Sequence, residues 1–251
     1  MIKADQPTIF DYKKLRVIVS SASDGNISPR WGSPETVRTN IDGALEAMGE
    51  VPKQVIVLKV ADDQNNWDSI REVEEGSPSD IAADALVTKA PGLALWLPIA
   101  DCCPVVMHDP VHRVVALAHL GWQSTNVDLA NKVVAFLKQN HQTSPADLLV
   151  YAGPCIKAES YVFTKQILAK RGILDDPRWQ PFLHDTSRGI EVDIVGYNIN
   201  DLQTAGVQSD HIQVCPVNTG TSLDYFSHHR SSLVPNGTEP EGRFATVCML
   251  V

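Results

Sequence analysis

The spacing of apolar residues along the chain predicts alternating strands and helices. Apolar runs without a polar alternation are typical of strands that are covered on both faces. Such strands are predicted at 15–20, 54–60, 92–102, 103–108, 113–119, 148–151, 211–215 and 244–251. Apolar residues spaced three and four positions apart predict helices at 35–48, 127–137, 164–171 and 194–205. This order indicates a buried sheet with further layers packed on its faces.

Two polar segments interrupt this pattern. Residues 21–34 are rich in Ser, Gly, Asn and Pro, and a loop of this length is expected to have a functional role. Residues 62–80 are acidic and lack periodicity, which indicates a surface excursion rather than a linker between domains. No repeat divides the chain, so residues 1–251 are expected to form a single domain.

Composition and charge narrow the class of protein. The sequence is 43% hydrophobic and 20% charged, as in ordinary globular proteins. Its formal net charge of -9 argues against a nucleic-acid surface, which needs clustered Lys and Arg. No window has the roughly 18 apolar residues of a membrane span, and the start has no apolar signal-like region. We therefore expect a cytoplasmic protein that acts on a small molecule, with neither nucleic-acid nor membrane partners.

The five cysteines are expected to be reduced thiols. Their number is odd, they lie in apolar runs, and none of them forms a CxxC pair. For Cys155 and Cys215, ordinary burial is the expected role.

A predicted hairpin brings a cysteine close to a histidine. The sequence Asp109-Pro110-Val111-His112 is typical of a turn. If residue 108 pairs with 113, Cys102 lies opposite His119, at the Cβ separation of about 4.5 to 5.5 Å of directly paired residues. A bulge near Pro104 would shift this register. His108 and His112 flank the turn and are expected to be solvated.

The residues around this pair have two interpretations. A thiol beside an imidazole can share a proton or hold a metal ion, and Asp101 adds a neighbouring carboxylate. Alternatively, Cys102 is a small buried hydrophobe and His119 a core histidine. Trp122 follows a glycine just after the strand, where it can stack on a planar ligand or pack in the core. The pattern alone leaves both interpretations open.

Three segments give the chain a resemblance to a known family. They are ADALVT at 83–88, ADCCPV at 100–105 and AHLGW at 118–122, with looser matches in GPCI at 153–156, FSHHR at 226–230 and GR at 242–243. The sequence resembles the laccase-domain or polyphenol oxidase-like (YfiH-like) family, whose members are described as purine nucleoside phosphorylases and peptidoglycan editing factors. The resemblance implies an α/β fold, a layered α-β sandwich with a mixed sheet.

The resemblance also implies a metal site and a set of ligand-binding residues. The family's zinc ligands are one cysteine and two histidines, which map to Cys102, His119 and, in place of the second histidine, Asp62. The chain lacks the many histidines of copper oxidases, which argues against copper. The substrate-binding candidates are Trp122, Gln123, which replaces a family arginine, Arg230 and Arg243.

The activity implied by the resemblance is phosphorolysis or deamination of purine nucleosides, as in a purine nucleoside phosphorylase or an adenosine deaminase. Cys102, His119 and Asp101 would be the catalytic residues, and a purine nucleoside and phosphate the substrates. Two alternatives remain open. One is a cysteine-dependent amide hydrolase of the peptidoglycan editing type. The other is a catalytically silent relative that binds a nucleoside or a protein.

Overall fold

Two mixed sheets form the centre of the molecule. The computed structural model describes residues 6–60, 66–234 and 240–251. The first sheet has the strand order β1 (Leu15–Val19), β14 (Phe244–Leu250), β6 (Leu93–Ile99), β2 (Gln54–Lys59) and β4 (Asp80–Ala82). The second has the order β13 (Ile212–Val214), β9 (Leu149–Ala152), β7 (Cys103–Asp109), β8 (Val114–Leu120), β5 (Ala85–Thr88) and β3 (Ile70–Glu72). Each sheet combines parallel and antiparallel pairs.

Alternate residues of the strands pack on opposite sides. In β6, Leu95 and Leu97 belong to the core between the two sheets, whereas Trp96 packs with the buried residues of α1 (Pro34–Glu46). In β8, Leu117 joins the core between the sheets, and Ala118 faces the outer helices. The strands lack polar alternation because both of their faces are covered.

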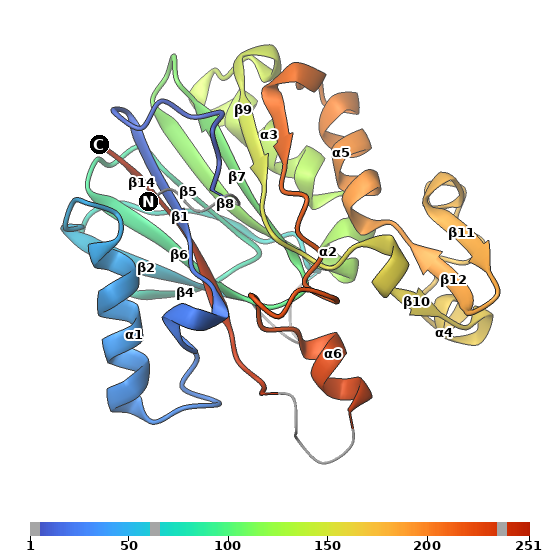
Figure 1. Cartoon of the computed structure of the whole chain (residues 1–251). Coiled ribbons are helices and arrows are strands. Elements are labelled where there is room, and N and C mark those ends of the chain that lie inside the picture. Colours follow the sequence, from blue (N-terminus) through green and yellow to red (C-terminus); the bar gives the residue numbers. More distant parts are fainter. Residues whose placement is uncertain (1–5, 61–65, 235–239) are drawn as a thin grey trace.

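Helices form the two outer layers. Helix α1 covers the first sheet, while α3 (Leu129–His141) and α5 (Ile194–Thr204) cover the second, as Figure 1 shows. Ser33 begins α1 by accepting a hydrogen bond from the Thr36 amide, with Pro34 in the first turn. The predicted layered α-β sandwich with mixed sheets is confirmed. None of the helices in the described ranges has the length and apolarity that crossing a bilayer requires.

A small lobe, residues 157–193, projects from the end of α5 (Figure 1). It contains α4 (Lys165–Lys170) and a sheet with the order β10 (Val162–Phe163), β12 (Gly189–Val192) and β11 (Leu183–Thr186). Its own apolar cluster includes Leu168 and Trp179 and continues to Tyr197 of α5. The remaining helices are α2 (Trp122–Asn126) and α6 (His228–Leu233). Single 3-10 turns lie at Ala22–Asp24, Pro145–Asp147, Ala158–Ser160, Gln180–Phe182 and Ser209–His211.

The predicted register of the central hairpin is wrong by two residues. Strand β7 pairs Asp109 with Val114 and Pro104 with His119, so Cys102 does not face His119 directly. The Asp109 carboxylate accepts hydrogen bonds from the amides of Val111 and His112, and the next residue, Arg113, is left-handed at φ 53°. The loop keeps four residues but lies one position later, at 110–113 instead of the predicted 109–112.

The prediction that His108 is solvated is also wrong. Its side chain is 1% exposed and contacts Phe10 edge-on, with 6.2 Å between the ring centroids. Neither ring nitrogen has a hydrogen-bond partner among the described residues, and burial lowers the pKa of His108 to about 4. The segment 62–80, predicted to be a plain surface excursion, contributes strand β3 and begins β4 at its end.

Candidate active site

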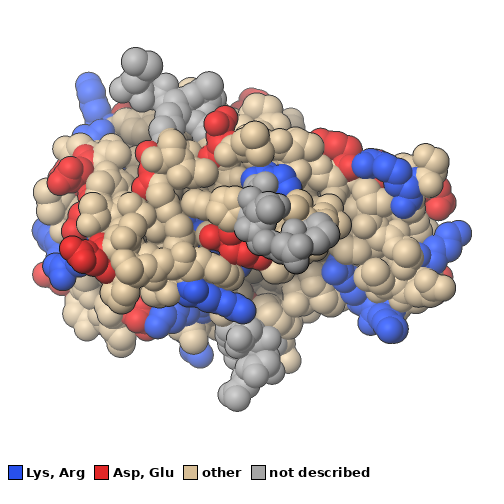
Figure 2. All heavy atoms as spheres, turned by 60° about the horizontal axis from the view of Figure 1, so that its bottom comes forward, with Lys and Arg blue, Asp and Glu red and all other residues tan. Residues whose placement is uncertain are grey.

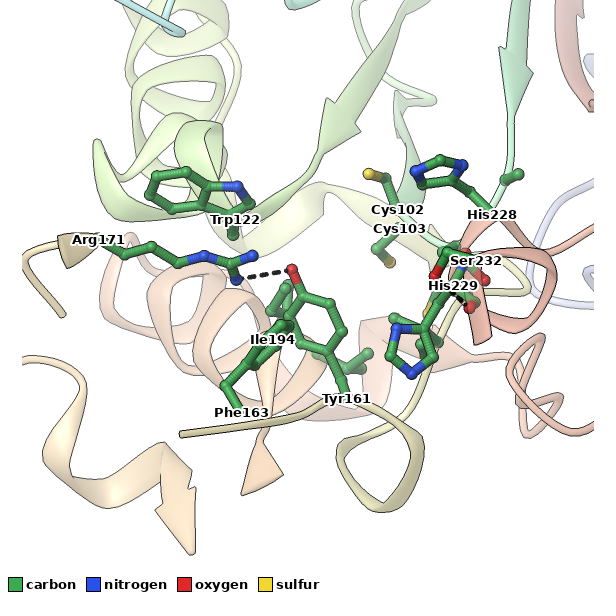
Figure 3. Close-up of a pocket in the computed structure, with 15 residues that line it drawn as sticks. Cys102, Cys103, Trp122, Tyr161, Phe163, Arg171, Ile194, His228, His229 and Ser232 are labelled. Carbon is green, nitrogen blue, oxygen red and sulfur yellow. Dashed lines mark hydrogen bonds between the residues drawn. The ribbon is translucent and has the colours of Figure 1, made fainter. Parts of the chain in front are cut away.

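A cavity of about 340 Å³ opens where β7 begins and where β8 and β9 end. Its walls come from the sheet edge, α2, the small lobe and α6 (Figure 3). Residues important for its chemistry are Asp101, Cys102, Cys103, Trp122, Cys155, Tyr161, Phe163, Arg171, His228 and His229. This volume lies in the range of small-molecule pockets, roughly 300 to 1,000 Å³.

Cys102 and His119 meet at Gly121 despite the shifted register. A Cβ atom added to Gly121 would lie 3.1 Å from Cys102 Sγ and 3.2 Å from His119 Cε1. Both side chains thus lie next to the space that a side chain at position 121 would occupy. Cys102 comes from the turn before β7, and His119 comes from the end of β8. Cys102 lines the cavity, and His119 lies behind it. Any larger residue at position 121 would displace one of the two groups.

Burial keeps both groups uncharged near neutral pH. Burial raises the pKa of the Cys102 thiol to about 12, and the nearby charge of Asp101 adds to this effect. Burial, together with the positive charge of Arg243, lowers the pKa of His119 to about 4. His119 Nδ1 is buried and has no hydrogen-bond partner in the described residues. The pair is therefore a thiol beside a neutral imidazole.

Asp101 ties the cavity wall together. Its carboxylate accepts one hydrogen bond from Thr219 Oγ1 and one from the backbone amide of His229, both at 2.7 Å. Its carbonyl accepts from the Ile156 amide at 2.8 Å, and its φ of 72° is left-handed. A strained residue held by three contacts fixes the direction in which Cys102 enters the cavity.

The predicted ligand-binding residues have different surroundings. Trp122 lines the cavity, whereas Gln123 of α2 is not part of its lining. The guanidinium of Arg230 donates to the carbonyl oxygens of three residues, Thr219, Ser222 and Tyr225, so it stabilises its own loop. The guanidinium of Arg243 lies 4.1 Å from the Trp31 ring centroid and 3.5 Å from Glu241, and its charge acts on Cys102 and His119.

The described residues supply two donors of a metal site. A thiolate sulfur and an imidazole nitrogen suit zinc, which usually takes four ligands. Within 6–60, 66–234 and 240–251, no group of three His, Cys, Asp or Glu side chains is placed to hold a metal ion. The third predicted ligand, Asp62, lies outside the described residues. The described part of the chain therefore does not complete a zinc site.

The pKa of a second thiol that lines the cavity, Cys155, is shifted in the opposite direction to that of Cys102. The Cys155 sulfur accepts from Lys157 Nζ at 3.5 Å, and Lys157 also donates to the Cys215 carbonyl at 2.9 Å. A hydrogen bond with Cys103, followed by the charge of Lys157, lowers the pKa of Cys155 despite its burial. Cys155 is buried as predicted, but no sequence pattern indicates its lysine partner.

The aromatic and cationic wall of the small lobe was also missed. Tyr161, Phe163 and Arg171 line the cavity, and Figure 3 shows them on the side away from Cys102. The only element predicted nearby is the helix at 164–171, which includes Arg171 but neither Tyr161 nor Phe163, and the fold of the lobe brings the three to Trp122. No short motif could have indicated this contact.

Comparisons with known proteins agree with this architecture. A model of the family described as multi-copper polyphenol oxidoreductase laccase matches residues 17–251. A purine nucleoside phosphorylase of Bacteroides thetaiotaomicron is 26% identical over 222 residues, which cover 84% of this chain and 81% of the relative. Another, from Deinococcus radiodurans, is 25% identical and covers 82% of this chain and 77% of its own.

Solved structures share the fold. The Bacillus licheniformis protein YfiH superposes with a TM-score of 0.76 at 22% identity, covering 94% of this chain and 93% of its own. YlmD from Geobacillus stearothermophilus superposes with a TM-score of 0.74 at 24% identity, covering 90% and 84%.

Proposed function

Because this chain belongs to the multi-copper polyphenol oxidoreductase laccase family, we propose that it is an enzyme that cleaves purine nucleosides by phosphorolysis in the cavity beside Cys102. The observation that carries this proposal is the convergence of Cys102 and His119 over Gly121 at the edge of a ligand-sized cavity. The names of relatives that match about four fifths of this chain support the substrate class.

The cavity offers suitable contacts for a nucleoside. The rings of Trp122 and Tyr161 give the cavity apolar walls against which a nucleoside can pack. In phosphorolysis, a phosphate oxygen bonds to the sugar carbon C1′, the bond from C1′ to the base nitrogen breaks, and the base takes up a proton. The Cys102 thiol keeps its proton, so it can donate a hydrogen bond to the departing base. His119 would position that thiol from behind.

Zinc remains a prediction for this site. Cys102, as a thiolate, and His119, with Asp62 as the proposed third ligand, would hold the ion, which would then supply a Lewis acid in place of the hydrogen bond from the Cys102 thiol. Metal analysis of the purified protein tests this prediction, and it tests the expected absence of copper in the same run.

The experiment is chromatographic analysis of adenosine and inosine incubated with the protein, with and without phosphate. Base release that requires phosphate and is lost in Cys102→Ala supports phosphorolysis, and conversion of adenosine to inosine would instead show deamination. Wild-type protein that leaves both nucleosides intact would overturn the proposal and favour a silent binder. The amide hydrolase alternative has less support, because a nucleophile must ionise and burial raises the pKa of Cys102.

A further inference from the structure

Among the described residues, Arg171 is the one Lys or Arg whose side chain lines the cavity. Its guanidinium carbon lies 4.2 Å from the ring centroid of Phe163, 4.8 Å from that of Trp122 and 5.8 Å from that of Tyr161. One nitrogen, Nη1, donates to Tyr161 Oη at 3.1 Å. Three rings and a hydroxyl therefore hold the guanidinium in one place, which lowers the entropic cost of binding a ligand.

This cation has no carboxylate partner. In the described ranges, no Asp or Glu oxygen lies within 4.0 Å of Arg171, whereas Arg188 and Arg243 each contact one carboxylate and Arg178 contacts two. Its other N–H groups donate to no acceptor in the same part of the chain. An arginine fixed at a cavity wall without a counter-charge is suited to bind an oxyanion with two parallel hydrogen bonds.

The small lobe around Arg171 carries no net formal charge, in contrast to the acidic remainder of the chain. Residues 157–193 contain six Lys and Arg and six Asp and Glu, so the rest of the chain carries the whole net charge of -9. Figure 2 shows Lys and Arg side chains on the outside of the lobe, at the right of the view. The Asp101 carboxylate is occupied by Thr219 and His229, and Figure 3 shows its neighbour Cys102 across the cavity from Arg171.

We propose that Arg171, held by Trp122, Tyr161 and Phe163, is the phosphate-binding residue of the cavity and supplies the positive charge that Gln123 does not. This inference rests on the proposed function for its choice of phosphate among oxyanions. The nucleoside would then lie between the two ends, with its sugar toward Arg171 and its base near Cys102. Burial raises the pKa of Tyr161 to about 12, so the hydroxyl beside Arg171 adds no negative charge that would repel a phosphate.

The test is direct binding of inorganic phosphate, without nucleoside, by titration calorimetry at constant ionic strength. We expect Arg171→Gln to weaken phosphate binding at least about tenfold, which corresponds to about 1.4 kcal/mol. Arg171→Lys keeps the charge but not the planar fork, so it should bind with intermediate affinity. The matched control is Lys170→Gln, which removes one exposed charge from the adjacent residue and should change the affinity less than twofold.

Circular dichroism and thermal unfolding confirm that each variant is folded. Wild-type protein that binds no phosphate, or Arg171→Gln that binds it as tightly as wild type, would overturn the inference. The proposed function can fail separately. Phosphate binding that depends on Arg171, in a protein that does not cleave nucleosides, would support the anion site and contradict the phosphorylase activity. Nucleoside cleavage whose KM for phosphate is unchanged in Arg171→Gln would support the phosphorylase activity and contradict the anion site at Arg171.

Discussion

The burial of His108 makes stability depend on pH in a way that one substitution can isolate. The imidazole lies between the two sheets, neither of its nitrogens has a hydrogen-bond partner in the part of the chain that the structure describes, and burial lowers its pKa from 6.5 to about 4. In the unfolded chain it binds a proton below about pH 6.5, but in the folded chain only near pH 4. The unfolded state is therefore favoured as the pH falls through this window, and the penalty is absent above pH 6.5.

The size of the effect follows from the two pKa values. Between pH 7.5 and pH 4.5, the proton linkage of His108 costs about 2 to 3 kcal/mol of unfolding free energy. His108→Leu removes this titration and keeps an apolar side chain of similar size. Urea unfolding should therefore show that the variant loses about 2 to 3 kcal/mol less than wild type over this pH range, whereas the exposed-site control His184→Leu should behave like wild type. Equal losses in wild type and His108→Leu would refute the reasoning.

The remaining predictions concern the cavity. In Gly121→Ala, the new methyl group lies 3.1 Å from Cys102 Sγ and 3.2 Å from His119 Cε1, so we expect nucleoside cleavage to fall by at least about tenfold. The control is Gly43→Ala, whose added carbon meets no neighbouring atom within 4 Å in the described residues, so this variant should keep its activity. Steady-state kinetics compares the two variants. A rate for Gly121→Ala similar to that of wild type would contradict the geometry. Lys157→Met should raise the pKa of Cys155, because it removes the ammonium at 3.5 Å from the sulfur. The thiolate absorbance near 240 nm is followed against pH, with Cys155→Ser as the reference. Its midpoint should move to higher pH, and an unchanged midpoint would contradict the effect of Lys157 on the Cys155 pKa.

The layered core could be predicted from the sequence because its signal is local. Leu95, Trp96 and Leu97 form a continuous apolar run, and a strand with such a run must be covered on both faces. The hairpin register could not be predicted, because it depends on how the Asp109 carboxylate caps the loop amides and on the left-handed Arg113. Moving a loop of the same length by one position changes the partner of every residue by two, and the apolar pattern does not fix that position.

The candidate site divides in the same way. Cys102, Asp101 and Trp122 lie in adjacent motifs, so their presence at one sheet edge follows from the order of the strands. Arg171 and Lys157 reach their partners only through the tertiary packing of the small lobe and of the segment after β9. No local sequence pattern indicates either contact. The solvent exposure predicted for His108 failed because proximity to a turn does not decide which face of the strand a residue occupies.

The central claim is that this cavity cleaves purine nucleosides with phosphate and that Cys102 is essential for it. The most direct test is the rate of hypoxanthine release from inosine as phosphate is increased, measured for wild type and Cys102→Ala, with ribose 1-phosphate quantified as the second product. The account predicts a saturable rate with equal amounts of the two products in wild type, and a rate at least about a hundredfold lower in the variant. Hypoxanthine release at a rate that does not depend on phosphate would contradict the account, and so would a Cys102→Ala variant as active as wild type.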